Sequence, residues 1–408
     1  MAITVITQPQ LIAPIYNPLI VTCSSTHVAQ PNFKYVFDVY VDYPTGVSYK
    51  RFKLSARPDG YGMIDVHRVL ESYLSYDFSI AGQSVILNDN SYVNYRVRIG
   101  EEYGTTPAVT PNLATITKIA FNGALKTSIG SGGVDVNFID FDFTEYSAAS
   151  GTLGKFLTSS PRTIYIDDNQ SYALHFMNDA NFISTDRVVF KYYEDGFGLI
   201  STRNVPLIAG SKFARVLCGT RNIRITNPSD LTNCVLYTVQ IQQVTGATRS
   251  ELFVFEIKEQ CSKAKEHFRL HWLNELGGFD SFNFNYTFKR KFNIQKQSFE
   301  QMLGRMSSGA FTYSPTQKGK SQFNTVATEK IEITSDWITE EESKWLSSLV
   351  ASPQIFWEIE QPLADTPTYI PVLITNGSYQ QKTYAVDNKL FELQLEMEIG
   401  NDINKQRQ

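Results

Sequence analysis

The sequence predicts a mainly β protein, made of consecutive antiparallel β-sandwich or β-barrel domains with few short helices. Apolar and polar residues alternate along many short runs, which is typical of strands that bury one face. Turn residues separate these runs at short intervals, as they do in sandwiches and barrels. The period of an amphipathic helix is clear at only two places.

The clearest predicted strand lies near the end of the sequence. Its apolar face consists of Phe391, Leu393, Leu395, Met397 and Ile399, and its polar face of Glu392, Gln394, Glu396 and Glu398. Residues 33–43 and 93–99 show the same alternation. Further β-rich runs cover residues 113–121, 134–143, 162–167, 186–193, 213–218, 234–242 and 251–258. This density of strands favours sandwiches.

Two helices are predicted, over residues 64–75 and 339–350. The apolar stripe of the first contains Val66, Val69, Leu70, Tyr73 and Leu74, with Asp65 as its cap. In the second, Thr339 and Glu342 have the spacing of a capping box, and Pro353 ends the helix. Its buried stripe is Trp345, Leu346, Leu349 and Val350.

Composition changes at two places and predicts three domains. Residues 146–160 are small, polar and rich in Gly and Ser, as linkers are, and residues 260–265 are charged without alternation. The expected domains are a β-sandwich at 1–146 with the first helix, a β-sandwich at 155–262, and a β domain at 263–400 with the second helix. Residues 401–408 have nothing to bury, so we expect a flexible tail there.

Composition excludes several classes of protein. Aromatic residues make up 13% of the 408 residues, too many for a disordered chain, and a net charge of −4 provides no positive field for nucleic acid or anionic lipid. Prolines interrupt the apolar start, and no window reaches the roughly 18 apolar residues of a membrane span. We therefore expect a soluble protein without membrane contact. The cysteines Cys23, Cys218, Cys234 and Cys261 form no C-x-x-C pair and are expected to be buried.

No candidate chemical site in the sequence is complete. Acid pairs for glycosidase chemistry or calcium binding are Asp140 with Asp142 and Asp167 with Asp168, which fit a strand face and a turn better. The glycines at 130–133 precede a strand, so they fit a hairpin loop rather than a phosphate site. Lys289, Arg290, Lys291 and Lys296 lie among aromatic residues, which fit core packing better than nucleic-acid stacking.

Two polar strand faces are candidate sites of interaction. His267, Arg269 and His271 alternate with apolar residues, and the two histidines are too far apart on a strand to share a metal ion. We interpret this row as a surface or subunit contact. The row of Glu392, Glu396 and Glu398 is either a solvated exterior or an acidic lining.

Several phrases of the sequence carry a resemblance to a known group. In order, they are HFRLHWLNELGGFDSFNFN, KRKFNIQKQSFE, TVATEKIEITSDWITEEESKWLSSLVASPQIFWEIE, YIPVLITNGSYQQKT and KLFELQLEMEIGNDINKQR, preceded by APIYNPLIVTCSSTHVAQPNFKYVFDVYV and GKFLTSSPRTIYIDDNQSYALHF. They resemble virion structural proteins of tailed phages that infect Bacteroidetes, including the crAss-like phages. The strand–helix–strand order at 328–360 is similar to tail-tube and distal-tail folds.

The resemblance implies a structural tail, ring or baseplate-like protein with no enzymatic activity, metal or cofactor. The expected partners are further copies in a ring of six or twelve, other tail or portal-proximal virion proteins, and DNA that passes without sequence-specific binding. The expected location is the virion tail, after assembly in the bacterial cytoplasm. An acidic lumen lined by Glu392, Glu396 and Glu398 would not retain DNA.

Two alternatives belong to other classes of protein. One is a carbohydrate-binding or adhesin-like module at the bacterial surface, and the other is a glycan-degrading enzyme with paired carboxylates. The first needs exposed aromatic rings, whereas the four tryptophans, Trp272, Trp337, Trp345 and Trp357, all fit buried stripes. Light scattering and negative-stain microscopy would separate a ring from a sugar-binding monomer.

Overall fold

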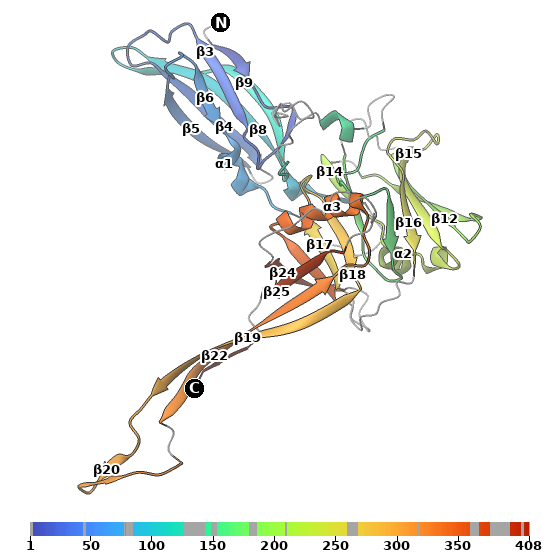
Figure 1. The fold of residues 1–408 in the computed structure, drawn as a ribbon. Helices are drawn as coiled ribbons and strands as arrows, with labels where there is room; N and C mark the ends of the chain where they lie inside the picture. Colours follow the sequence, from blue (N-terminus) through green and yellow to red (C-terminus); the bar gives the residue numbers. More distant parts are fainter. Residues whose placement is uncertain are drawn as a thin grey trace, which may run out of the picture. The chain divides into compact units, whose positions relative to one another are not determined.

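The computed structural model describes residues 3–43, 46–76, 78, 85–125, 143–147, 153–178, 186–208, 210–258, 268–316, 319–359, 367–375, 392–400 and 404–407. The described chain is mainly β with short helices, as predicted (Figure 1). Its contacts divide it into two units. Unit 1 contains Met1–Glu259 and Leu273–Asp280, and unit 2 contains Gln260–Trp272 and Ser281–Gln408.

The first sandwich of unit 1 has two sheets around one core. One sheet has the order β2 (Ile12–Pro14), β9 (Ala108–Phe121), β8 (Tyr92–Tyr103), β4 (Lys34–Tyr43), β5 (Gly46–Ser55), and the other has the order β1 (Ile3–Thr7), β3 (Ile20–Ser25), β6 (Gly62–Asp65). The alternating residues Tyr35, Phe37 and Val39 of β4 are fully buried, as their spacing predicts.

The second sandwich of unit 1 is built in the same way. Its larger sheet has the order β10 (Thr163–Ile166), β16 (Phe253–Ile257), β15 (Leu236–Gln243), β12 (Asp186–Tyr193), β13 (Leu199–Pro206), and its smaller sheet has the order β11 (Ala173–Met177), β14 (Phe213–Leu217), β7 (Val85–Leu87). The helix α2 (Thr220–Thr226) and the turn η5 (Pro228–Leu231) follow β14. Phe190, Tyr237 and Phe255 lie in the core.

Unit 1 differs from the predicted domains at two points. Strand β7 comes from the predicted first domain but pairs with β14 of the second sandwich. The predicted linker is not solvated near its end, because Phe156 and Leu157 are buried, with exposed fractions of 0% and 2%. A small apolar cluster that includes Phe121, Leu157 and Phe213 joins the two sandwiches. This shared burial explains why both sandwiches belong to one unit.

The first helix is shorter than predicted. It consists of α1 (His67–Leu70) followed by the 3₁₀ turn η1 (Glu71–Tyr73), and its N-cap is Val66. Asp65 lies one residue earlier, where its Oδ1 accepts hydrogen bonds from the backbone N–H groups of Leu19 (2.9 Å) and His67 (3.2 Å). The remaining described 3₁₀ turns are η2 (Asp89–Ser91) and η4 (Phe143–Tyr146).

The main sheet of unit 2 has a helix over its apolar face. The sheet has the order β18 (Phe279–Phe284), β17 (Phe268–Leu273), β23 (Ile355–Ile359), β24 (Thr368–Ile374), β25 (Gln394–Ile399), β22 (Lys320–Thr334), β19 (Thr287–Glu300). The helix α3 (Glu340–Ala351) begins at the predicted capping box, in which Thr339 Oγ1 accepts from Glu342 N–H at 3.2 Å. Trp345, Leu346 and Leu349 are buried as predicted, and Trp272 Nε1 of β17 donates to Ser348 Oγ at 2.9 Å.

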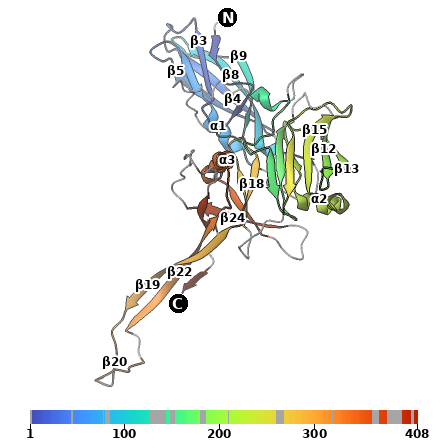
Figure 2. The ribbon, with the colours of Figure 1, turned by 45° about the vertical axis from the view of Figure 1, so that its right-hand side comes forward.

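Four residues of the predicted flexible tail, 404–407, form a strand. Strand β26 (Asn404–Arg407) pairs antiparallel with β22, from Asn324↔Arg407 to Ala327↔Asn404. The prediction rested on side-chain burial, whereas a strand edge is satisfied by backbone hydrogen bonds whatever the side chains are. Beyond this point β19 and β22 continue as a pair to the short hairpin β20 (Arg305–Ser307) and β21 (Ala310–Thr312), as Figures 1 and 2 show.

Several predictions lie wholly or largely outside the described residues: the strand at 134–143, the loop at 130–133, Asp140, Asp142, Cys261 and His267. The other cysteines, Cys23, Cys218 and Cys234, are buried, and burial raises the pKa of Cys23 to about 12. A thiol with a raised pKa stays protonated and unreactive at neutral pH.

Candidate functional site

The two polar rows that the sequence singled out lie on one face of the sheet of unit 2. Arg269 pairs with Glu358 across β17 and β23, and Glu398 pairs with Leu373 across β25 and β24. Cross-strand partners share a face, and alternate residues along β24 connect the two pairs. The sequence showed two separate rows, and strand order makes them one surface.

The Arg269 and His271 end of this face is a buried network. His271 Nε2 lies 2.7 Å from Glu358 Oε2, and Arg269 Nε lies 3.3 Å from the same oxygen. Ser281 Oγ lies 2.6 Å from His271 Nδ1, and Arg269 also donates to Asn283 Oδ1 at 2.7 Å. The exposed fractions of Arg269 and His271 are 5% and 0%. The prediction that these two residues form a surface contact is therefore wrong, because Glu358 partners them inside the chain.

Burial determines the protonation of this network. Burial lowers the pKa of His271, and the charge of Arg269 lowers it further. The hydrogen bond and the charge of Glu358 raise this pKa, but burial is the largest effect. The neutral ring accepts from Ser281 at Nδ1 and donates to Glu358 from Nε2. Ser281, His271 and Glu358 are linked by hydrogen bonds in the same order as the Ser-His-acid triad of serine hydrolases. Here all three are buried, with at most 4% of their surface exposed, so the arrangement stabilises the sheet and offers no access to a substrate.

The glutamate end of the face is half-buried and of mixed charge. Glu396 pairs with Lys330 at 2.7 Å, and this contact lowers the pKa of Glu396. Glu332 pairs with Lys291 at 2.7 Å. Glu398 lies opposite Lys330 in the register, while Glu392 is exposed. The structure therefore places lysines from β19 and β22 among the carboxylates, so this row is not purely acidic as the sequence indicated.

The feature that sequence reasoning missed is a β-arm, residues 287–334. Strands β19 and β22 pair along their full lengths, from Thr287↔Thr334 to Glu300↔Lys320, with a bulge after Gln297. The hairpin of β20 and β21 turns at Ser308 and Gly309, whose φ values of 52° and 83° fit a type I′ turn. The figures show the arm leaving the rest of the sheet of unit 2 (Figures 1 and 2).

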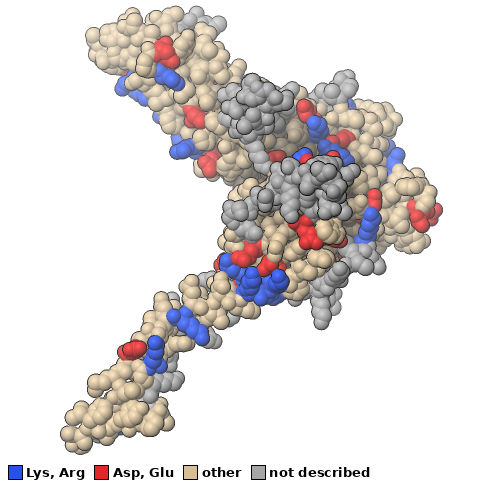
Figure 3. All heavy atoms as spheres, in the orientation of Figure 1, with Lys and Arg blue, Asp and Glu red and all other residues tan. Residues whose placement is uncertain are grey.

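Apolar side chains cover the outer arm, residues 292–323, without a core to bury them. The exposed large apolar residues are Phe292, Ile294, Phe299, Met302, Leu303, Met306, Phe311, Tyr313 and Phe323. Phe292 is 60% exposed and Met302 is 78% exposed. Figure 3 shows lysines, arginines and acids gathered at the base of the arm, whereas the visible face of its end is mostly uncharged. Exposed apolar surface of this extent marks a site of interaction.

The outer arm has little to stabilise it within the described chain. A two-stranded hairpin is at best marginally stable in water, because it lacks a third strand or a second layer. Among the described residues, the outer arm is held by its paired backbone, by β26 beside Asn324–Ala327 at its inner end, and by small contacts such as Phe299 with Phe323, whose ring centres lie 6.2 Å apart. Docking on another protein would bury its exposed side chains and hold its shape.

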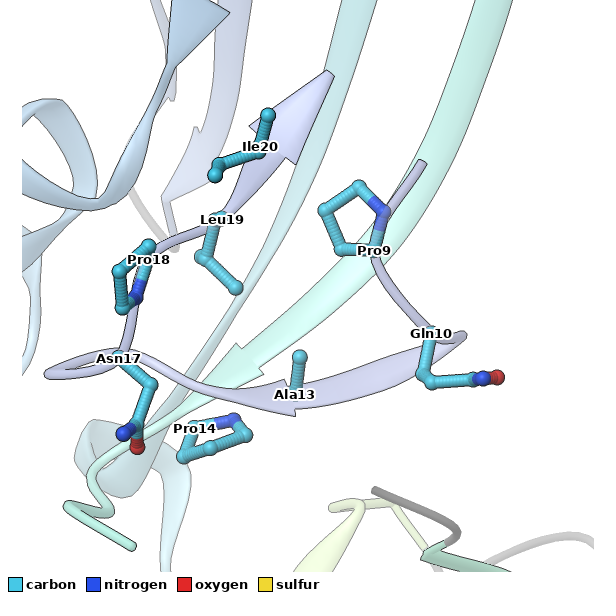
Figure 4. A pocket seen from close by; sticks show the side chains of 8 residues that line it. All are labelled: Pro9, Gln10, Ala13, Pro14, Asn17, Pro18, Leu19 and Ile20. Carbon is cyan, nitrogen blue, oxygen red and sulfur yellow. The ribbon is translucent and has the colours of Figure 1, made fainter. Parts of the chain in front are cut away.

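A small pocket in the first sandwich is lined mainly by apolar residues. Figure 4 shows it between the segments Pro9–Pro14 and Asn17–Ile20. Its polar groups are few, and Asn17 is used by the fold, donating to Leu125 O and accepting from Leu125 N–H, both at 2.9 Å. Without convergent polar groups the pocket has nothing to orient a ligand.

The described residues also bear on metal binding and membrane insertion. Within them, no three His, Cys, Asp or Glu side chains gather as metal ligands would. No helix of the described chain is long and apolar enough to cross a membrane. Asp167 and Asp168 lie in a turn after β10, as predicted, where Asp168 pairs with Arg224.

Comparison with known proteins gives no family. No protein-family model matches the chain, and no curated protein matches it. Among solved structures, the crystal structure of the calcium-binding domain CBD12 of CALX1.1 is similar over 60% of this chain and 96% of that chain. The identity is 6% and the TM-score is 0.19, so this likeness carries no argument about function.

Proposed function

We propose that this protein is a structural component of a phage tail. In this proposal, six or twelve copies form a ring around the DNA channel and join neighbouring virion proteins, and the arm makes the joining contact. The proposal includes assembly in the bacterial cytoplasm and passage of DNA without sequence-specific binding. It assigns the protein no enzymatic activity and no cofactor.

One observation carries the proposal: an arm with nine exposed large apolar side chains extends from a well-packed sheet. Exposure of these side chains to water is unfavourable in an isolated monomer, and their burial on docking is favourable. Such a segment suits a protein that joins subunits, whereas neither catalysis nor sugar binding calls for it. The sequence phrases quoted above supply the further step from an assembly protein to a phage tail.

The mixed-charge row at the base of the arm suits a passage for DNA. A strongly basic surface would retain DNA through its phosphates, and a row of Lys–Glu pairs presents little net charge. If this row faces the channel, Glu392, Glu396 and Glu398 balance Lys330 and its neighbours there. The row then acts as a lining that DNA passes without binding.

The alternative function, a carbohydrate-binding module, has one observation in its favour. Trp337 is 59% exposed, which corrects the prediction that all four tryptophans are buried. A single exposed ring is a weak platform, and the stacked pair Tyr40 and Tyr49 is covered by arginines, with Arg98 4.6 Å from the Tyr40 ring centre. The phage-tail proposal accounts for more of the exposed apolar surface.

The test uses a shortened arm. Gln297 and Asn324 pair directly, so an Asn-Gly turn can join them and replace residues 298–323. Light scattering and negative-stain microscopy then compare this variant with the wild type, alone and after co-expression with portal and tail proteins. We expect rings or incorporated copies for the wild type, and a folded, unincorporated monomer for the variant. Equal incorporation of both, or a wild-type monomer that only binds polysaccharide, contradicts the proposal.

A further inference from the structure

The hairpin between β12 and β13 carries an unusual residue at its tip. Phe197 is 76% exposed and has a φ of 64°. Among the described residues, the other non-glycine residues at positive φ are four asparagines and one serine, which tolerate this conformation better. A bulky ring in this conformation costs free energy, and its exposure recovers none through burial.

The hairpin holds Phe197 in place through its backbone. Phe197 N–H donates to Glu194 O at 3.0 Å, and Glu194 N–H donates to Gly198 O at 2.9 Å. Glu194 also lies close over Gly198, where an added Cβ would be 2.5 Å from Glu194 Oε1. Glu194 and Asp195 are exposed beside the ring. The tip is therefore a preformed apolar knob with two acids next to it.

Because Phe197 is both strained and exposed, a contact with another molecule would account for its conformation. Strained conformations persist where they serve a binding or switching role. Leu199, which follows at the start of β13, is 57% exposed and extends the apolar surface of the knob. β13 is an end strand of its described sheet, so nothing in that sheet continues past it. We define the knob as Glu194–Leu199.

The arm has the complementary chemistry. Residues 287–334 contain eight Lys or Arg and three Glu, a net charge of +5. Since the whole chain carries −4, the remaining residues carry −9. On the outer arm, Lys296, Arg305 and Lys320 stand among the exposed apolar side chains. The arm is thus basic and apolar, and the knob is acidic and apolar.

We propose that the knob of one copy binds the outer arm of a second copy of this chain. Phe197 and Leu199 pack against the exposed apolar side chains of the arm, while Glu194 and Asp195 face its lysines. The contact is head-to-tail, because two different surfaces meet, and such contacts generate rings when the rotation closes. This inference rests on the proposed function, because it names the receiver of the arm.

The test separates binding from folding by means of Phe197→Asn. Asparagine accepts a positive φ, so we expect the melting temperature to rise by about 2–4 °C. We expect the dissociation constant for self-association to rise at least tenfold, measured by sedimentation velocity over a concentration series. The matched control is Val244→Asn, because Val244 is 58% exposed in another turn next to β15. It should leave self-association unchanged.

A charge exchange identifies the two surfaces. Glu194→Lys with Asp195→Lys should weaken self-association at least tenfold, and adding Lys296→Glu with Lys320→Glu in the same chain should restore it. Three results would overturn the inference. They are association of Phe197→Asn as strong as in the wild type, no recovery of association in the fourfold variant, and a wild type that is monomeric at every concentration. If only the shortened arm abolishes association, the proposed function stands and the knob is excluded as the receiver.

Discussion

The base of the arm and the outer arm are the same two strands in two different surroundings. At the base, Ile331 and Ile333 of β22 are fully buried on the face that α3 covers. Farther along that face, Phe292 and Ile294 of β19 are 60% and 55% exposed. The alternation of apolar residues is alike in both regions. Burial therefore depends on a second layer, which the base has within the chain and the outer arm lacks.

The two regions should differ most in how much stability they lose when an aspartate replaces an apolar residue. Leu395→Asp places a carboxylate at a base position that is 1% exposed, so we expect a loss of several kcal/mol and little soluble protein. Ile294→Asp places the same charge on the outer arm and should leave the melting temperature nearly unchanged. Soluble yield and thermal melting measure both. Equal effects of the two substitutions would remove the distinction between base and arm.

The next largest effect tests the buried network of the base. Glu358→Ala leaves Arg269 and His271 without their carboxylate partner, so we expect unit 2 to lose about 3–5 kcal/mol. All four tryptophans lie in unit 2, so their fluorescence during urea unfolding reports on this unit. A matched control is Glu300→Ala on the outer arm, whose carboxylate is 78% exposed. A loss below 1 kcal/mol for Glu358→Ala would show that the network is not needed.

The pH dependence of unit 2 gives a smaller effect. Because burial lowers the pKa of His271, the folded state keeps this ring neutral while the unfolded chain takes up a proton below about pH 6.5. His271 thus stabilises unit 2 fully above that pH, and the contribution falls as the pH decreases towards the folded-state pKa. We expect His271→Gln to flatten the stability profile by at most about 1.4 kcal/mol per pH unit. The shortened arm should keep the wild-type slope, and identical slopes for His271→Gln and wild type would refute this assignment.

The smallest effect concerns the layer that covers the base. Thr339→Ala removes the side chain that accepts from Glu342 N–H at the start of α3, so we expect a loss of about 1 kcal/mol. Thr339→Ser retains the hydroxyl and serves as the control. Urea unfolding measures both variants. If Thr339→Ser lost as much stability as Thr339→Ala, the methyl group of Thr339, and not its hydroxyl cap, would stabilise the helix.

Local patterns were sufficient to predict the elements of the fold. Period-two alternation identified β4, β8 and β25, and the capping box identified the start of α3, since both are set by neighbouring residues. Strand order was not available from alternation. The order of the strands in the sheets decides that β7 pairs with β14 and that Arg269 lies opposite Glu358. Those pairings join residues far apart in the sequence.

The sequence could not distinguish the arm from a core strand. Phe288 and Phe292 alternate like core residues, and Phe288 indeed packs at the edge of the core while Phe292 is exposed. Length is one signal of the arm, although β9 of the first sandwich, with 14 residues, is as long as β19. Strands β19 and β22 have 14 and 15 residues, well above the usual five or six. The excess net charge of +5 on residues 287–334 is a second signal.

Hydrogen exchange of the outer arm tests the central claim most directly. In the isolated protein, backbone amides of residues 292–316 and 319–323 should exchange quickly, because no second layer covers them. In the purified assembly the same amides should become protected, while those of Ile331 and Ile333 at the base stay protected in both states. Equally fast exchange of the outer arm in both states would contradict the claim that the arm joins this protein to its neighbours.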